Sequence, residues 1–593
     1  MLIRATQDFP RFYKFSLGVK MVDICLDMSM LPRPGGYIIR RPPSIRIFNP
    51  PLTKTRIKMK TNILYFPLLV LLSSVSLCSC SNDDEPVVTA TDGTTLTVTA
   101  RADGFASTDG TAHTGTPQTD TPQTRASESG YTTTFVKGDQ IGVFAVRDGS
   151  VITGCQNMPL TYNGTSWSGS APVYKYADAT YFAYYPYTAS MNSKTSVDEI
   201  VTAFNATVTA ATDQSTYAKY TACDLMTATA ESPTSGTSLS FSFTHKMSLI
   251  EISLPVQKYK TTNGADAYEY SAPVLNPTFS LTLSGSGATR ITPYYMGNGA
   301  FRYIVPAGTS GTTVSGAFNT ADNKTIEYSK SSLSLSAGNY KRLNVTYDGA
   351  PSATPTERAL AVGDFYYSDG GIVPGDTKTP PSGGCIGIVC WVGRDAFNED
   401  PLLKRDYPGC THGLVVALKE AGSMLWSNSY EYVQNWVKTE NGNPYKDVVN
   451  LLATDKRCGY SNTLALKDYN AKKYNSAVGS NNDYRVLPID AIEQYAVENP
   501  APANSSGWYF PSVMELKYVC WGQGNGLSAS GRNNLNTYIS KVSGTVFGDD
   551  YCWSSTEVNN SSNAWGVNFS SGSVHGSSDK TYLPSHVRPL LAF

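Results

Sequence analysis

The chain has 593 residues and a formal net charge of −1, with 47 Lys and Arg against 48 Asp and Glu. This balance excludes the strongly basic surface that binding to nucleic acid or to an anionic membrane requires. Charged residues make up only 16% of the chain, which also contains 49 Gly and 38 Tyr. Such a composition favours a mostly β, extracellular protein over a helical cytosolic enzyme.

The first 80 residues contain a secretion signal preceded by a segment of no clear pattern. Residues 1–58 carry Pro-rich clusters and no sustained period of 2 or 3.6. Residues 59–80 have a basic head, an apolar run and a small-residue cleavage site, as in a signal peptide. The apolar run, 63–77, is shorter than the ~20 residues of a membrane span. We interpret 1–58 as a non-native N-terminal extension, with a genuine cytoplasmic or targeting extension as the alternative. For the signal at 59–80, the alternative is an uncleaved anchor helix.

The end of this signal resembles the lipobox of bacterial lipoproteins. Leu77 and Ser79 occupy the positions before Cys80 that the pattern requires, whereas Cys78 fits less well. The resemblance implies that Cys80 carries a fatty acid such as palmitate and is the lipidation site. The acidic run 83–85 resembles the export tag of lipoproteins from Bacteroides-like bacteria. It implies a surface-exposed lipoprotein of the cell outer membrane.

Residues 81–130 combine this acidic tag with one strand and one loop. Thr95–Ala100 alternates apolar and polar residues and predicts a β-strand. The loop 107–129 is rich in Thr and Pro, which favours an extended, solvated segment that proteases reach. Arg125 lies in this loop.

The segment 131–348 contains short apolar runs separated by turn residues and no long helical period. This pattern is typical of a β-sandwich. His245 has no His or carboxylate at ligand spacing, so we interpret it as a satisfied structural histidine. The strands are expected at 140–146, 181–185, 239–243, 249–254, 279–283 and 340–347.

Four blocks in this region resemble fimbrillin-type (Mfa-like) pilus lipoproteins. The resemblance covers about residues 90–348 and implies two stacked transthyretin-like Greek-key β-sandwiches. It also implies assembly with other pilin subunits by strand exchange, after a protease removes the first strand. Arg125 stands where such a protease cleavage would fall; a plain solvated arginine is the alternative. The blocks are Phe135–Phe144, Tyr181–Tyr187, Asp224–Met226 and Phe243–Ser248.

The chain changes character after residues 349–359, which are a linker by composition. All but one of the 8 Trp follow it. Ser512 and Glu515 have the spacing of a helix-capping box. The pattern predicts an α+β domain over 360–593. Further helices are expected at 430–437 and 533–542, and strands at 386–392, 413–418, 564–569 and 586–592.

The C-terminal region resembles a second family. Its blocks are similar to those of DUF1566-like domains, which are related in fold to C-type lectins and formylglycine-generating enzymes. The resemblance implies an α+β, C-type-lectin-like domain. The blocks are Asp364–Gly370, Gly507–Ser512 with Glu515-Leu516, Tyr551–Glu557, Asn563–Phe569 and Val587–Pro589.

The sequence shows no arrangement that predicts catalysis. A nucleophile with placed acid–base partners is not evident, and neither is a zinc-type Cys-x-x-Cys constellation. We therefore expect no enzyme, with a formylglycine-generating-type enzyme as a less favoured alternative. No cofactor is expected, although Asp549, Asp550, Glu557 and Asp579 offer hard oxygen ligands for calcium. The cysteines beyond Cys80 permit either disulfides or buried free thiols.

A ligand-binding face is expected in two C-terminal loops, 559–562 and 572–582. Amide, carboxylate and aromatic groups on loops suit recognition of a polar ligand such as a glycan. We expect Trp553 and Trp565 to be core residues instead. The sequence thus predicts a fimbrial tip-type adhesin that binds a glycan or matrix-protein ligand. A membrane-retained fimbrial anchor is the alternative. The expected ligand-binding residues are Asn559, Asn560, Asn563, Asp579 and Tyr582.

Overall fold

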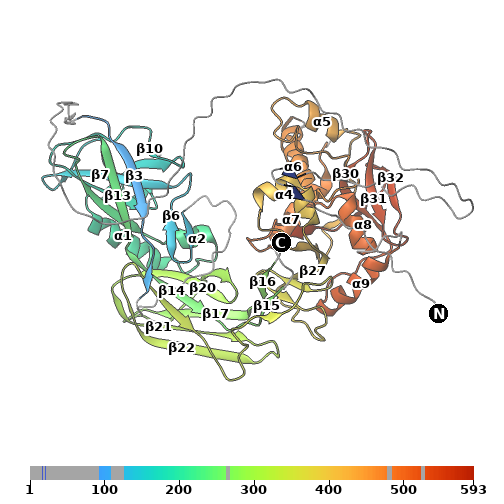
Figure 1. The fold of residues 1–593 in the computed structure, drawn as a ribbon, viewed down its shortest axis with the longest axis horizontal. Helices are drawn as coiled ribbons and strands as arrows, with labels where there is room; N and C mark the ends of the chain where they lie inside the picture. The colour runs from blue at the N-terminus through green and yellow to red at the C-terminus, as the bar shows by residue number, and fades with distance from the viewer. Residues whose placement is uncertain are drawn as a thin grey trace, which may run out of the picture. The chain divides into compact units, whose positions relative to one another are not determined.

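The computed structural model describes residues 93–107, 126–261, 267–476, 484–522 and 528–593, with two short strands at Ser16–Leu17 (β1) and Lys20–Met21 (β2). The chain divides into two compact units, 1–83 and 84–593. Signal residues 59–80, including Cys80, and Arg125 lie outside the described residues. The protein is mostly β, as predicted (Figure 1). No described helix is long and apolar enough to cross a membrane.

The first sheet closes on itself. Its strands follow the order β11-β12-β13-β3-β10-β9-β7-β8, and β7 pairs again with β11. This closure differs from the expected sandwich of two separate sheets, and it pairs the strands that would otherwise be edges. The strands are β3 (Thr97–Ala102), β7 (Gln140–Arg147), β8 (Ser150–Val151), β9 (Met158–Tyr162), β10 (Trp167–Ser168), β11 (Thr180–Tyr185), β12 (Met226–Glu231) and β13 (Ser238–His245).

Strand β3 lies between β13 and β10, although the three segments are far apart in sequence. It runs parallel to β13, from Thr97 opposite Ser238 to Ala102 opposite Phe243, and antiparallel to β10. Figure 1 shows β3, in blue, alongside the green β13. The expected strand is therefore present, and it is needed to complete the closed sheet.

Helix α1 (Val197–Ala210) was not predicted by the sequence analysis. Ser196 caps it by accepting a hydrogen bond from the Glu199 amide. Its buried residues recur every four positions, at 200, 204 and 208, and they join a core that includes Leu249 of the next sheet. Helix α2 (Tyr217–Thr221) and the 3-10 turn η1 (Ala189–Met191) accompany it.

Most strands of residues 247–344, together with β4 from the N-terminal segment, form two sheets that share one apolar core, as the sandwich prediction requires. One sheet has the order β19-β20-β14-β23-β4, and the other β18-β17-β21-β22. Ile250 and Ile252 of β14 meet Phe279 and Leu281 of β17 in this core. The strands are β4 (Ala106–Ser107), β14 (Met247–Ser253), β17 (Leu275–Thr282), β18 (Thr289–Ile291), β19 (Tyr294–Gly297), β20 (Ala300–Pro306), β21 (Thr309–Asn319), β22 (Thr325–Leu335) and β23 (Asn339–Asn344).

Part of the predicted linker is a strand. Residues Thr356–Glu357 form β24, which pairs in parallel with β15 (Lys258–Lys260). Strand β16 (Glu269–Ser271) completes this small sheet on the other side of β15. The start of the C-terminal region is thus hydrogen-bonded to the preceding sandwich.

The C-terminal region is α+β, as predicted. Its sheets have the orders β26-β25-β27-β28-β34 and β29-β33-β30-β31-β32. Both capping-box hydrogen bonds expected for Ser512 and Glu515 are present at the start of α8. The strands are β25 (Phe365–Tyr367), β26 (Ile372–Val373), β27 (Cys385–Val392), β28 (Gly413–Ala417), β29 (Gly422–Met424), β30 (Tyr551–Glu557), β31 (Asn563–Asn568), β32 (Val574–Asp579), β33 (Ser585–Val587) and β34 (Leu590–Ala592).

Helices pack with these two sheets in one hydrophobic cluster. Four of them, α3, α4, α6 and α7, were not predicted. The eight described cysteines are all free, and all but Cys385 are buried, so the described residues contain no disulfide. The helices are α3 (Asp395–Glu399), α4 (Pro401–Asp406), α5 (Val433–Thr439), α6 (Gly459–Ser476), α7 (Leu487–Glu498), α8 (Val513–Trp521) and α9 (Ser530–Ile539), followed by the 3-10 turn η3 (Ser540–Val542).

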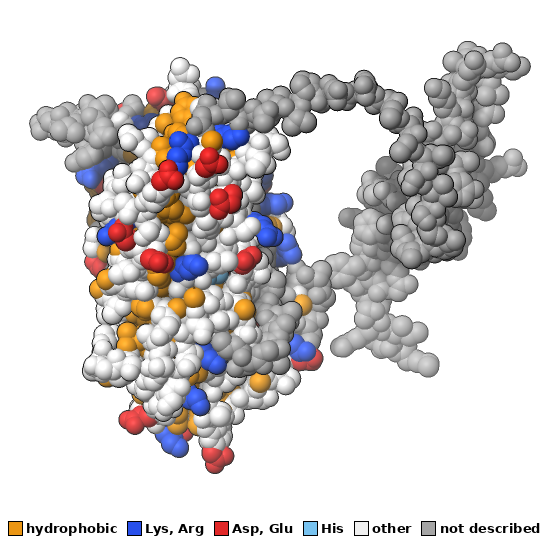
Figure 2. All heavy atoms as spheres, turned by 90° about the vertical axis from the view of Figure 1, so that its left-hand side faces the viewer, with side chains coloured by type: hydrophobic (Ala, Val, Ile, Leu, Met, Phe, Trp, Pro, Cys, Tyr) orange, Lys and Arg blue, Asp and Glu red, His pale blue; other side chains and the backbone are white. Residues whose placement is uncertain are grey.

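Charges on the surface are few and mixed. On the face drawn in Figure 2, blue and red side chains are interspersed on a mostly white, uncharged surface. This distribution agrees with the net charge of −1 and the 16% of charged residues. The surface in that view offers no single-sign patch to a charged partner.

Candidate functional site: a removable strand and a binding face

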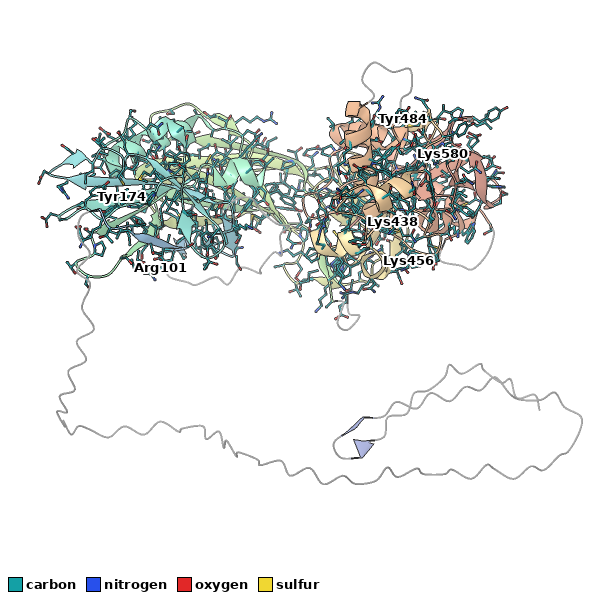
Figure 3. All side chains as sticks on the ribbon, turned by 90° about the horizontal axis from the view of Figure 1, so that it is seen from above. Arg101, Tyr174, Lys438, Lys456, Tyr484 and Lys580 are labelled. Atoms are coloured by element: carbon teal, nitrogen blue, oxygen red, sulfur yellow. The ribbon has the colours of Figure 1, made fainter. Side chains whose placement is uncertain are left out.

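Strand β3 is held by backbone pairing with β13 and β10, by buried Val98 and by two side-chain hydrogen bonds. Val98 is 2% exposed and faces the core of the closed sheet, whereas Thr99 and Arg101 point to the surface. The Thr99 hydroxyl donates to Ser240 Oγ at 3.0 Å, and Arg101 Nε donates to Ser242 Oγ at 2.9 Å. Figure 3 labels Arg101 on this strand. Backbone pairing and alternate apolar side chains are features that any strand of similar pattern supplies.

The end of the β3 segment is fixed by His245. Its Nε2 lies 2.9 Å from the Asp103 carbonyl, its Nδ1 lies 2.8 Å from Asp224 Oδ1, and the Phe105 ring stacks on it. Burial opposes the charged ring, but Asp224 and the hydrogen bonds outweigh burial and raise the pKa of His245. His245 is therefore the structural histidine that we expected, although its carboxylate partner is 21 residues away in sequence.

The residue immediately after Arg125 is hydrogen-bonded to groups outside β3. Ala126 is 3% exposed, its N–H donates to Tyr185 Oη at 2.9 Å, and its carbonyl accepts from the Tyr217 hydroxyl. It leads into the hairpin of β5 (Ser127–Ser129) and β6 (Thr132–Thr134). Glu128 in β5 is buried against Arg302, with 2.8 Å between Oε2 and Nη1. Burial raises the pKa of this carboxyl, which Arg302 opposes.

Two of the predicted ligand-binding residues meet two tyrosines that the sequence analysis missed. The Tyr430 hydroxyl donates to Asp579 Oδ2 at 3.0 Å, and the Tyr432 hydroxyl donates to Asn559 Oδ1. These contacts span 149 and 127 residues, so no local sequence signal links them. We call Tyr430, Tyr432, Asn559, Asp579 and Tyr582 the C-terminal face.

The C-terminal face exposes aromatic surface. Tyr582 is 75% exposed and Tyr430 53%, and Leu583, next to the face in sequence, is 63% exposed. Burial opposes ionisation of Asp579, but hydrogen bonds from Thr581 and Tyr430 outweigh it and lower the pKa of this carboxyl. The face therefore combines a carboxylate, an amide and tyrosine rings, which together suit a polar ligand with an apolar side.

Asn560 and Asn563 form the turn beneath this face. The Asn560 side-chain oxygen accepts hydrogen bonds from the amides of Ser562 and Asn563, at 2.9 and 2.8 Å. Asn563 stands opposite Asp579 in the β31–β32 ladder. The expectation of a loop at 572–582 is therefore wrong for 574–579, which form β32 because they pair with β31. Asn560 and Asn563 position the loop 559–562, and Asn560 is only partly exposed.

A buried ion pair supports the C-terminal face from below. Lys580 Nζ pairs with Glu557, and both side chains are 0% exposed. Glu557 accepts hydrogen bonds from the Val433 and Gln434 amides at the start of α5, while Lys580 donates to the Glu431 carbonyl at 2.7 Å. The pair thus ties the loop carrying Tyr430 and Tyr432 to strands β30 and β32. Figure 3 labels Lys580 in this region.

The carboxylates considered as calcium ligands have other partners. Glu557 pairs with Lys580, Asp549 pairs with Arg532, and Asp550 lies 3.3 Å from His586 Nε2. Among the residues with described positions, no three His, Cys, Asp or Glu side chains form a group that would hold a metal ion.

The two tryptophans expected in the core differ. Trp553 is 2% exposed and is a core residue. Trp565 is only partly buried and packs against the core, with its ring over Gly576. The expectation of a core position therefore holds for Trp553 and is only partly met by Trp565.

Comparison with known proteins identifies the family. The model of a family described as fimbrillin-like matches residues 124–360. A relative from Bacteroides ovatus, named "Putative fimbrium tip subunit Fim1C", is 31% identical over 479 residues, covering 74% of this chain and 84% of the relative. The chain belongs to the fimbrillin-like family.

A solved structure is similar to this fimbrillin over most of its length. The match to the crystal structure of a fimbrial protein from Bacteroides ovatus covers 84% of this chain and 100% of that protein's chain. The TM-score is 0.53 and the sequence identity is 26%. The predicted fimbrillin resemblance is confirmed, and a fimbrial subunit is located at the cell surface. The likeness of residues 360–593 to DUF1566-like domains stays a prediction.

Proposed function

We propose that this fimbrillin is a tip-type adhesin whose C-terminal face binds a polar ligand, a glycan or a matrix protein, on a host or bacterial surface. The observation that carries the proposal is the exposure of Tyr582, at 75%, and Tyr430, at 53%, beside hydrogen-bonded Asp579. Tyrosine is enriched at binding interfaces because its ring is apolar and its hydroxyl can hydrogen-bond. The proposal involves no catalysis.

The C-terminal face is suited to shallow recognition. Tyrosine has few rotatable bonds, so it offers contact area at a low entropic cost. The buried Lys580–Glu557 pair beneath the face keeps its loops in place. Each hydrogen bond to a ligand contributes on the order of 1 kcal/mol. Firm adhesion therefore depends on several copies acting together.

A glycan and matrix-protein array tests this proposal. The secreted chain is applied as wild type, as Tyr582→Ala and as the control Tyr551→Ala. Tyr551 is a suitable control because it is also an exposed tyrosine, at 40%, but lies at the other end of β30 from Glu557 and the C-terminal face. A binding signal that is lost only in Tyr582→Ala would support ligand binding at the C-terminal face. Equal signals for all three chains would reject it. We propose no cofactor, so a calcium chelator is expected to leave the signal unchanged.

We further propose that the subunit assembles by strand exchange after cleavage at Arg125. The position of β3 between β13 and β10 supports this, because its departure leaves two strand edges ready to pair with a strand of another subunit. N-terminal sequencing of surface-extracted protein should then begin at Ala126. A mature protein that begins at Cys80 would instead favour the membrane-retained anchor.

The lipid anchor is proposed at Cys80, which makes the precursor an outer-membrane lipoprotein. Metabolic labelling with a fatty acid should mark the wild type and Cys78→Ala but not Cys80→Ala. Label that persists in Cys80→Ala and disappears in Cys78→Ala would move the anchor to Cys78.

A further inference from the structure

We propose that Asp139 and Tyr185 form a receptor for the α-ammonium group that cleavage before Ala126 creates. The inference rests on the cleavage at Arg125 proposed above. An arginine-specific protease adds one water to the Arg125–Ala126 peptide bond. The products are a carboxylate on Arg125 and an amine on Ala126, which takes up a proton at neutral pH.

The groups needed for such a receptor are already in line before cleavage. The Ala126 nitrogen donates to Tyr185 Oη at 2.9 Å, and Tyr185 Oη donates to Asp139 Oδ1 at 3.1 Å. Asp139 is 2% exposed and Ala126 3% exposed. The future amine is thus one hydroxyl away from a buried carboxylate.

The chemistry of the cut explains why a carboxylate is useful there. A peptide N–H is neutral and needs only the Tyr185 oxygen as an acceptor. The new ammonium carries a positive charge, and a buried charge is costly unless a partner of opposite sign is close. Asp139 supplies that charge, so cleavage turns a neutral hydrogen bond into a charge-assisted one.

The surroundings hold both partners in position. Asp139 Oδ2 accepts from the Val136 amide at 2.7 Å, which fixes the carboxylate. The Tyr217 hydroxyl donates to the Ala126 carbonyl, so the residue stays in place when its amide is cut. A pocket of about 570 Å³ is lined by Asp139 and Tyr185 and gives water access to the site. The other charged group on the segment, Glu128, pairs with Arg302.

The receptor would make the cleaved state distinct from the intact one. The ordered residues 126–134 gain a charged anchor at the moment when β3 loses its covalent link to them. The closed sheet can then lose β3 while the new N-terminus stays bound, which favours exchange for a partner's strand over local unfolding.

The test uses the secreted chain with Pro122→Ile, Gln123→Glu and Thr124→Gly, so that factor Xa cuts directly before Ala126. Acylation of the new α-amine is followed by mass spectrometry of the N-terminal peptide across pH. A nearby opposite charge raises the pKa of an amine by about one to three units. We therefore expect acylation at pH 7 at least about tenfold slower in this parent than in its Asp139→Asn derivative.

Two tyrosine variants keep the test independent of the stability of Asp139→Asn. Tyr185→Phe should also speed acylation, whereas Tyr181→Phe should not, because it removes a comparably bonded hydroxyl on the same strand. Equal rates in the parent, Asp139→Asn and Tyr185→Phe would overturn the receptor. Sequencing of the protein from cells reports separately whether the proposed maturation occurs, so the two proposals fail independently.

Discussion

Replacing Val98 by alanine should lower the stability of the closed sheet in the uncleaved chain. It should leave the stability of the chain that has been cleaved and has lost β3 unchanged. Val98 is 2% exposed and stands opposite Trp167 and Leu239 in the closed sheet. Val98→Ala removes two buried carbons at about 0.8 kcal/mol each, and the space left behind adds a cavity contribution. A loss of about 2 kcal/mol follows, equivalent to about a 30-fold change in the local opening equilibrium.

Hydrogen exchange of the β13 amides measures this loss without assuming that the whole chain unfolds in one step. Before cleavage, these amides should exchange about 30-fold faster in Val98→Ala than in wild type. Thr99→Ala, at an exposed position of the same strand, is the control and should change little. After cleavage and release of β3, all three chains should exchange alike. An equal loss before and after cleavage would refute the view that β3 is a removable strand.

Three further predictions concern buried groups. The folded state raises the pKa of His245. Protonated His245 therefore stabilises the fold fully below about pH 6.5, and this contribution to stability is lost as pH rises through the raised pKa. Melting curves across pH should show this slope in wild type and not in His245→Asn. Lys580→Met leaves Glu557 buried without its partner and should cost about 3–5 kcal/mol, partly recovered by adding Glu557→Gln; chemical denaturation checks both. Trp553→Ala should cost about 3–5 kcal/mol, and Trp565→Ala less, because its ring is only partly buried.

Local rules predicted much of the fold. In β13, Leu239, Phe241 and Phe243 are buried and alternate with exposed residues, so the period of 2 alone identifies the strand. The capping box of Ser512 and Glu515 likewise depends on atoms only three residues apart. Such features could be read from the sequence because both partners are local.

The missed features depend on distant parts of the chain. Helix α1 is an exception, because Ile200, Phe204 and Val208 recur every four positions behind the Ser196 cap and form an apolar stripe that the sequence offers. Its core is completed by Leu249 of another sheet. The closure of the first sheet requires pairing of β7 with β11, which no local pattern encodes. Tyr430 and Tyr432 join the C-terminal face by bonds across more than a hundred residues.

Attachment of cells that display the variants tests the adhesin proposal most directly. Tyr582 is 75% exposed, so about a quarter of its ~200 Å² contributes to folding, worth roughly 1 kcal/mol at most. Tyr582→Ala should therefore weaken attachment while leaving the melting temperature nearly unchanged. Asp579→Ala should also weaken attachment, with some loss of melting temperature because it removes the hydrogen bonds from Thr581 and Tyr430. Tyr551→Ala should attach like wild type. Attachment that is undiminished in both C-terminal face variants, at equal surface abundance, would contradict the proposal.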